Sequence, residues 1–154
     1  IVLDISHLSD GGVEDLFRLT DRPLIASHSN ARELCDQPRN LRRDQIQEMI
    51  RRGGLIGINF FRPFVGGGDA VGLDDLLRHM EYILELGGEH VLALGTDFDG
   101  CDGLLPGGVA GVDSIPAVAG AMRAHGFGER LVERILFQNA ADFWCGSLPP
   151  AERN

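Results

Sequence analysis

The stretch LIGINFF, residues 55–61, is almost unbroken apolar sequence, and it decides the fold class. A strand with one solvated face alternates apolar and polar residues, whereas a strand buried on both faces is a continuous apolar run. Residues 55–61 are of the second kind. Similar short runs occur at residues 1–5, 24–26 and 90–98. Strands of this kind are typical of parallel sheets with helices on both faces.

Amphipathic stretches separate the four runs, so strands and helices alternate. The segment RPFVGGGDAVG, residues 62–72, is expected to be a flexible connection. Asp10 is a plausible cap for the first helix, and Gly53-Gly54 ends the second. The predicted helices cover residues 12–20, 44–52, 73–86, 114–125, 128–137 and 139–144. This alternation predicts an α/β fold with a parallel sheet and right-handed crossovers.

The number of strand–helix units limits the architecture. The choice lies between a doubly wound sheet and a (β/α)8 barrel, which needs eight units over about 250 residues. Four units in 154 residues predict a single domain, residues 1–154, that is the C-terminal half of a TIM barrel. The chain also opens inside an apolar run without a Met, so we expect it to be part of something longer. The glycine patterns of dinucleotide-binding and P-loop proteins do not occur in it.

Composition excludes several classes of partner. The net charge of −9, from 14 basic and 23 acidic residues, argues against a nucleic-acid or anionic-membrane surface. No apolar run approaches the roughly 20 residues of a membrane span. Three cysteines without CxxC spacing are expected to be incidental thiols. Together with the sequence pI near 4.9, this favours a cytoplasmic bacterial protein over a secreted one.

Polar residues that are capable of chemistry follow each predicted strand. They are His7, His28, Asn59, and the pair Asp97 and Asp99. In parallel α/β folds the carboxyl ends of the strands form the edge where ligands bind. Two neutral imidazoles on neighbouring strand ends could share a metal ion. If the fourth strand persists, the two aspartates point the same way before Gly100 permits a sharp turn.

Structural explanations compete with these functional ones. A histidine at a strand end is often a hydrogen-bonded structural residue, and DFDG alone could form an Asx-type turn. Arg39 could form an ordinary salt bridge. Asp4 is expected to support His7 or another polar neighbour from within its strand. The remaining histidines are expected to be solvated: His79, His90 and His125.

Several separated motifs nevertheless agree with one family. In order and spacing, DISHLSD (4–10), PLIASHSNARELCDQPRN (23–40), GLIGINFF (54–61) and LGTDFDG (94–100) resemble the membrane dipeptidase (renal dipeptidase) family, peptidase family M19. ILFQNAADFW (135–144) is similar to that family's closing helix. The resemblance implies a (β/α)8 barrel of the metal-dependent hydrolase type. It also implies two zinc ions that share a bridging carboxylate and a bridging water or hydroxide, and dipeptides as substrates.

The resemblance assigns roles to four residues. His7 and His28 match the two histidine ligands of one zinc ion. Arg39 matches the arginine that holds the C-terminal carboxylate of the substrate, for which a guanidinium fork is well suited. Asp97, the first aspartate of DFDG, matches the acid/base residue near the metals.

Other residues of the family pattern do not occur in these 154 residues. There is no His-x-Asp pair, and Glu14 and Glu33 lie in the wrong segments to provide the bridging glutamate. We therefore expect a zinc dipeptidase whose remaining ligands come from a missing N-terminal half or from a second chain, since open sheet edges invite pairing. The alternatives are a non-catalytic half-barrel that serves as a structural or interaction module, and an amidohydrolase-like metal enzyme with another substrate.

Overall fold

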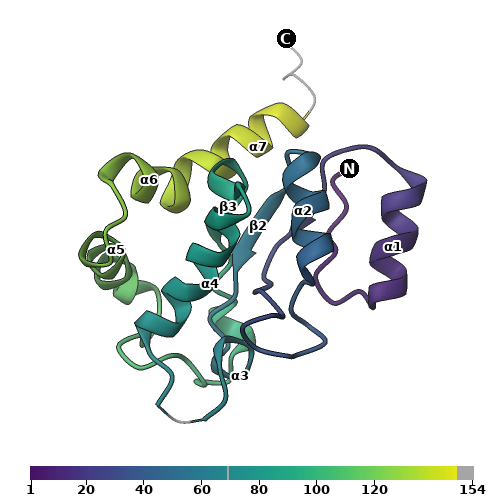
Figure 1. Cartoon of the computed structure of the whole chain (residues 1–154). Coiled ribbons are helices and arrows are strands. Elements are labelled where there is room, and N and C mark those ends of the chain that lie inside the picture. Colours follow the sequence, from purple (N-terminus) through teal and green to yellow (C-terminus); the bar gives the residue numbers. More distant parts are fainter. Residues whose placement is uncertain (69, 149–154) are drawn as a thin grey trace.

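A three-stranded parallel sheet forms the centre of the structure (Figure 1). The structure, a computed structural model, describes residues 1–68 and 70–148. The strands are β1 (Ile25–Ala26), β2 (Leu55–Ile58) and β3 (Leu92–Leu94), in that spatial order. Ile25 pairs with Leu55, and Ile56 pairs with Leu92. The predicted parallel α/β sheet is confirmed, with strands shorter than the apolar runs that contain them.

The first predicted strand, residues 1–5, is not a regular strand. Asp4 and Ile25 form an isolated parallel bridge, and the amide N–H of Ile5 donates to the carbonyl of Ile25 at 2.8 Å. The side chain of Asp4 then accepts the amide N–H of Ser6 at 2.9 Å, which turns the backbone out of the extended conformation. The segment therefore runs beside β1 in the parallel direction, although the prediction of a full strand is wrong.

Helices cover the sheet in the predicted order. They are α1 (Asp10–Leu19), α2 (Arg43–Arg51), α3 (Arg62–Val65), α4 (Leu73–Glu85), α5 (Ile115–Ala124), α6 (Glu129–Glu133) and α7 (Asn139–Ser147). Short 3-10 helices cover Gly88–His90, Phe98–Gly100 and Val112–Ser114, and a π-helix, Arg134–Gln138, joins α6 to α7. Two local predictions are wrong. Ser9, rather than Asp10, caps α1, and the expected flexible connection at 62–72 begins with α3; its residue 69 lies outside the described residues.

Neighbouring residues of each strand pack into two different cores. Ile56 and Leu92 lie in the larger core together with the apolar faces of α2 and α4. Leu55 and Ala93, one position away along their strands, pack with Phe143 of α7 in a smaller core. Side chains alternate between the two faces of a strand, so both faces of this sheet are covered. Continuous apolar sequence in β2 and β3 is the consequence.

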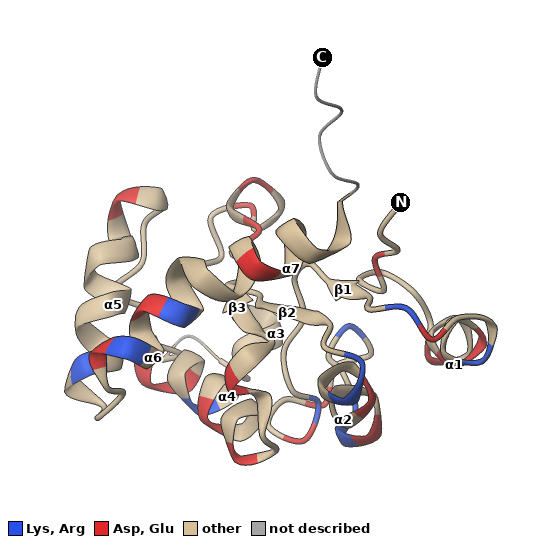
Figure 2. Ribbon diagram, turned by 90° about the horizontal axis from the view of Figure 1, so that it is seen from above, with Lys and Arg blue, Asp and Glu red and all other residues tan. Residues whose placement is uncertain are grey.

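Charged side chains of both signs are interleaved on the outer helices (Figure 2). Arg51 pairs with Glu48 at 2.6 Å, and Arg123 pairs with Glu129 at 2.6 Å.

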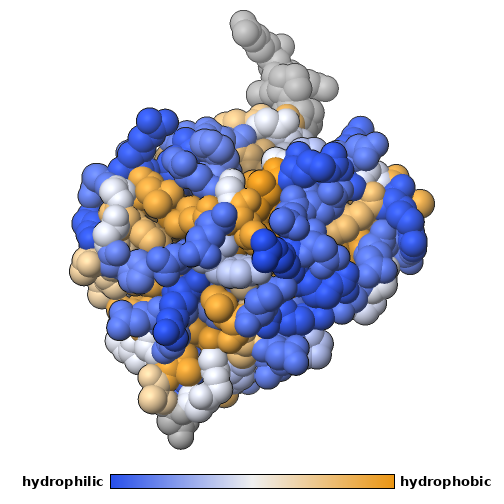
Figure 3. All heavy atoms as spheres, in the orientation of Figure 1, coloured by the Kyte–Doolittle hydropathy of each residue, from blue (hydrophilic) through white to orange (hydrophobic). Residues whose placement is uncertain are grey.

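Apolar surface on the face seen in Figure 3 forms several patches among hydrophilic side chains. Arg52 is buried, and its guanidinium donates to the carbonyl oxygens of Thr20 and Phe17. Within residues 1–68 and 70–148, no helix has the length and apolar character of a membrane span.

Glycines allow the backbone to come unusually close where β1, β2 and β3 end. A Cβ atom on Gly57 would overlap the carbonyl oxygen of Ser27 and would lie 2.8 Å from the Cα of Gly95. A Cβ atom on Gly95 would overlap the same carbonyl oxygen. All the atoms involved belong to the backbone, so no side chain can move aside. The carboxyl edge of the sheet therefore depends on two residues without side chains.

We expect the Gly57→Ala substitution to destabilise the protein by about 1–3 kcal/mol or more, because the added methyl group forces the strands apart. Gly120 is the matched control, since it is exposed inside α5 and a Cβ atom there meets nothing within 4 Å. Gly120→Ala should stabilise the protein by about 0.5–1 kcal/mol, the usual gain in a helix interior. Urea unfolding of both variants measures the difference. Equal effects of the two substitutions would contradict the close packing of the strand ends.

Candidate active site

The carboxyl edge of the sheet brings together two histidines and an aspartate. His7 follows the segment beside β1, His28 follows β1, and Asp97 follows β3. The Nε2 atoms of His7 and His28 are 2.8 Å apart, with the ring centroids at 4.9 Å. The Oδ2 atom of Asp97 lies 4.0 Å from Nε2 of His28. The structure therefore brings these three predicted site residues to one place.

Unusual backbone conformations aim two of these side chains. His7 and Asp97 have φ angles of 71° and 55°, in the left-handed region that non-glycine residues rarely adopt. Such conformations cost of the order of 1–3 kcal/mol and cluster at functional sites. β3 ends at Leu94 and a 3-10 turn follows Asp97, so the strand does not persist to the two aspartates, and the condition under which Asp97 and Asp99 would point the same way is not met. Asp99 is exposed.

The carboxylate of Asp97 accepts a hydrogen bond from Asn59 and lies close to the backbone of Gly100. The side-chain amide of Asn59, which follows β2, donates to Oδ2 of Asp97 at 3.4 Å. Asn59 is fully buried, and its own Oδ1 accepts the amide N–H of Phe61. A Cβ atom on Gly100 would lie 2.5 Å from Oδ1 of Asp97. Gly100 therefore provides room for the carboxylate, and it also ends the 3-10 turn Phe98–Gly100, in agreement with the sharp turn that the sequence indicates.

A chain of polar groups surrounds the ring of His28. Its Nδ1 atom is 2.8 Å from the hydroxyl of Ser27, which in turn lies 2.5 Å from Oδ2 of Asp4. The hydroxyl of Ser6 accepts the backbone N–H of His28 at 3.0 Å. Burial lowers the pKa of His28, and the charge of Asp97 opposes part of that shift. Both observations favour a neutral, fixed imidazole, which is the form that binds metals.

Arg39 points back to the same place from the long loop after β1. One of its terminal nitrogens lies 3.1 Å from Nε2 of His28, and its guanidinium stacks over the ring of Phe64 at 5.7 Å. The loop is closed by a parallel bridge between Ala31 and Leu41. The structure therefore places Arg39 beside His28, and its role in substrate binding stays a prediction.

A second arginine fixes the turn that carries Arg39. Arg32 donates to both carboxylate oxygens of Asp10 at 2.8 Å, to the carbonyl of Asn40 at 2.8 Å and to the carbonyl of Pro38 at 2.9 Å. The bidentate pair with Arg32 lowers the pKa of Asp10 to about 2. Arg32 thereby joins the start of α1 to the loop that carries Arg39, next to the site.

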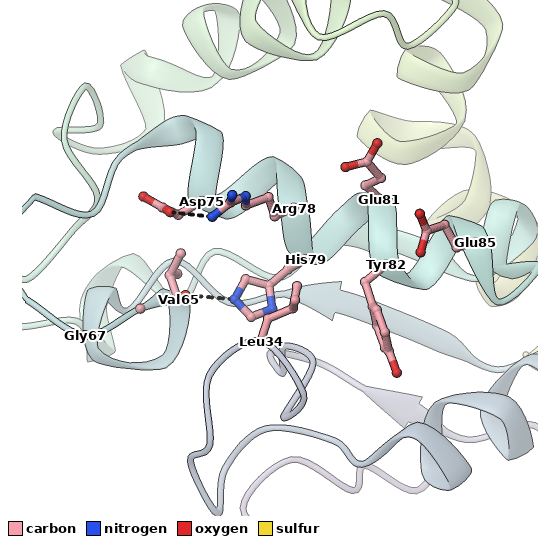
Figure 4. A pocket seen from close by; sticks show the side chains of 10 residues that line it. Leu34, Val65, Gly67, Asp75, Arg78, His79, Glu81, Tyr82 and Glu85 are labelled. Carbon is pink, nitrogen blue, oxygen red and sulfur yellow. Dashed lines mark hydrogen bonds and ion pairs between the residues drawn. The ribbon is translucent and has the colours of Figure 1, made fainter.

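His79 has a structural role, contrary to the prediction that it is solvated. It is buried on α4, where Nδ1 accepts the amide N–H of Ala31 at 3.1 Å and Nε2 donates to the carbonyl of Val65 at 2.9 Å. A cavity of about 590 Å³ lies beside it, lined largely by charged and polar side chains of α4 (Figure 4). His7, His28 and Asp97 do not line this cavity. Both ring nitrogens of His79 are satisfied, so neither is available to a metal.

The two converging imidazoles fit part of a zinc site. Nitrogens bound to one tetrahedral zinc ion lie about 3.3 Å apart. The Nε2 atoms of His7 and His28, which share a hydrogen bond at 2.8 Å, would have to separate by about 0.5 Å to bind the same ion. Catalytic zinc sites use three protein ligands. Among the described residues, no group of three or more His, Cys, Asp or Glu side chains could hold a metal ion. Two imidazole nitrogens suit zinc as ligands, but the described residues do not supply the third protein ligand of a catalytic site.

Sequence reasoning missed the supporting groups rather than the central ones. Ser6, Ser27 and Asn30 have no assigned role in the motifs, yet each hydrogen-bonds a residue at the site or its support. Asn30 joins the strand ends, since its Oδ1 accepts the amide N–H of Asn59 at 3.0 Å. A signal was present in the serines that flank His28, because a hydroxyl beside a histidine is a natural partner for its ring.

A parallel sheet that presents two imidazoles, a carboxylate and a guanidinium at its carboxyl edge is typical of metal-dependent hydrolases of the α/β class. The model of the membrane dipeptidase family (peptidase family M19) matches residues 1–144. The chain belongs to this family.

Relatives and solved structures agree with that assignment. The chain is 35% identical over 141 residues to an uncharacterized protein in the pqqA 5′ region of Klebsiella pneumoniae, covering 89% of this chain and 51% of the relative. It is 32% identical over 117 residues to an uncharacterized dipeptidase of Schizosaccharomyces pombe, covering 75% of this chain and 27% of the relative. The crystal structure of a metallopeptidase from Rhodobacter sphaeroides, liganded with a phosphinate mimic of the dipeptide L-Ala-D-Ala, superposes with a TM-score of 0.86 at 36% identity, covering 92% of this chain and 41% of that one. The chain thus spans about half, or less, of the length of these proteins.

The ion pair between Asp10 and Arg32 should make stability depend on pH in acid. The pKa of Asp10 is about 2 in the folded protein against an ordinary 3.8, so the pair stabilises the fold above pH 3.8 and its contribution is lost as the pH falls through about 2. The side chain of Asp10 is 39% exposed, so solvent screening limits the contribution to about 1 kcal/mol. Urea unfolding of wild type between pH 4 and 2 should therefore show a steeper loss of stability than that of Asp10→Asn.

A double-mutant cycle separates this pair from other acidic groups. In an Arg32→Gln background, the Asp10→Asn substitution should alter the slope of stability against pH much less, with a remainder from Gln45 and Arg42, which also contact Asp10. A slope that changes equally in both backgrounds would show that Arg32 is not the partner responsible.

Proposed function

We propose that this chain provides part of the active site of a zinc-dependent dipeptidase, as the C-terminal half of a (β/α)8 barrel. One observation carries the proposal. His7, Arg39 and Asp97 come from separated segments, and each has a side-chain atom within 4.0 Å of Nε2 of His28. Membership of the family supports it, and so does the dipeptide mimic bound by the relative from Rhodobacter sphaeroides.

His7 and His28 would hold the metal through their Nε2 atoms. A zinc ion bound there supplies Lewis-acid activation of water and of the scissile carbonyl. Asp97 would accept a proton from the attacking water and return it to the leaving amine, and the hydrogen bond from Asn59 would help to orient its carboxylate. Arg39 binds the free carboxylate of the dipeptide, which would select two-residue substrates by anchoring their C-terminus.

The remaining ligands would come from outside the 154 residues. A second metal ion, the bridging carboxylate and the other half of the barrel would be contributed by further sequence or by another chain. The same shortage of ligands favours the alternative, a non-catalytic module that keeps the family's residues for structural reasons. Metal binding distinguishes the two proposals.

We expect zinc to bind the 154-residue chain through His7 and His28. Titration against a chromophoric chelator should show that His28→Ala or His7→Ala lowers zinc affinity by more than about tenfold, since even loss of a supporting partner costs about 10–100-fold. His90→Ala is the matched control, because His90 is exposed and lies before β3, away from the carboxyl edge. If all three variants bind zinc like wild type, the chain is the non-catalytic module.

Arg39→Lys should raise the KM of the intact enzyme for a dipeptide about 10–100-fold and leave kcat nearly unchanged. The lysine keeps the charge but loses the bidentate fork, which is worth about 1.5–3 kcal/mol. A dipeptide with an amidated C-terminus is the control substrate, and its hydrolysis should not respond to the substitution. Equal effects on both substrates, at unchanged zinc content, would assign Arg39 to another role and favour a different amidohydrolase.

A further inference from the structure

The hydrogen bonds around His28 determine which of its ring nitrogens carries the proton. An ionised carboxylate only accepts hydrogen bonds, so the Ser27 hydroxyl donates its one hydrogen to Oδ2 of Asp4, at 2.5 Å. Ser27 then has only acceptor capacity for the ring of His28, 2.8 Å away. Nδ1 of His28 must therefore carry the hydrogen, and Nε2 carries the lone pair.

An independent contact on the opposite side of the ring leads to the same tautomer. Arg39 has only donors, and one of them lies 3.1 Å from Nε2 of His28. Nε2 is therefore an acceptor. The carboxylate of Asp4 can only accept hydrogen bonds and the guanidinium of Arg39 can only donate them. Acting through Ser27 and directly, respectively, they both favour the Nδ1–H tautomer of His28.

The position of Asp4 is itself fixed by the backbone. Its Oδ1 atom accepts the amide N–H groups of Ser6 at 2.9 Å and of Ser27 at 3.1 Å. These two bonds join the segment that carries His7 to the strand that carries His28. Oδ2 is consequently the oxygen that remains for the Ser27 hydroxyl.

We propose that Asp4 and Ser27 are positioning residues that hold His28 in the Nδ1–H form, so that its Nε2 lone pair is directed at the metal position. The metal-binding role of His28 rests on the proposed function. The tautomer itself follows from the hydrogen bonds of the metal-free chain. Asp4 thus organises both candidate ligands: it fixes the backbone beside His7 and, through Ser27, the ring of His28.

The geometry gives Asp4→Asn a specific consequence. The amide oxygen of the new side chain must take the place of Oδ1, because two backbone N–H groups point at it. Its NH2 group then faces Ser27 and donates to the hydroxyl. The direction of the relay is reversed: Ser27 now donates to Nδ1 of His28, the ring hydrogen moves to Nε2, and the metal-binding lone pair is lost.

Long-range proton–nitrogen NMR spectra of the metal-free chain at a pH of about 8, where an ordinary imidazole is neutral, distinguish the two tautomers through the nitrogen shifts. We expect His28 to be in the Nδ1–H form in wild type and to shift toward the Nε2–H form in Asp4→Asn, where Ser27 presents a donor to Nδ1. Ser27→Thr keeps the hydroxyl and should retain the wild-type tautomer. Ser29→Ala is the matched control, since that serine bonds the hydroxyl of Ser6 and not the ring.

The outcomes separate this inference from the proposed function. An Nε2–H tautomer in wild type overturns the inference without requiring any variant to fold, and so does an unchanged Nδ1–H form in folded Asp4→Asn. A confirmed tautomer should be accompanied by a fall of about 10–100-fold in zinc affinity in Asp4→Asn. If the tautomer responds but zinc affinity does not, the positioning of a metal ligand is overturned, and the dipeptide assays then test the function separately.

Discussion

Parallel pairing of short strands is the constraint on which the rest of this structure depends. The segment that contains Asp4 lies parallel to β1, and β1, β2 and β3 continue in the same direction. All four carboxyl ends therefore meet at one edge, although they are separated by up to ninety residues of sequence. An antiparallel arrangement of the same strands would place neighbouring ends on opposite sides, and His7, His28 and Asp97 could not converge.

The sheet that provides this edge is small, so its position must come from the surrounding packing. β1 has two residues and β3 has three. Apolar side chains on both faces hold them, with α2 and α4 on one side and Phe143 of α7 on the other. Asn139 adds a polar link, since its amide donates to the carbonyl of Leu92 at 2.7 Å. Rigid surroundings let loops of irregular conformation carry the polar groups of the site.

The sequence predicted what depends on local pattern and missed what depends on tertiary contacts. The apolar run at 55–61 predicted a strand buried on both faces, and the glycines at 53 and 54 predicted the end of α2. The sequence indicated a possible turn at DFDG after β3, but not the left-handed conformation of Asp97 with which that turn begins. Burial of His79 was also hidden, since its two partners, Ala31 and Val65, lie far away in the sequence.

Strain and polar burial at the site have one physical explanation. Left-handed conformations at His7 and Asp97 are unfavourable by themselves, and buried asparagines such as Asn59 are costly unless every polar group is bonded. Such features persist only where the surrounding structure over-determines them, and here Asp4, Ser27 and Asn59 each bond two or more partners. The same bonds restrict the side chains to one orientation, so the geometry of His28 and Asp97 is set by the fold of this chain itself.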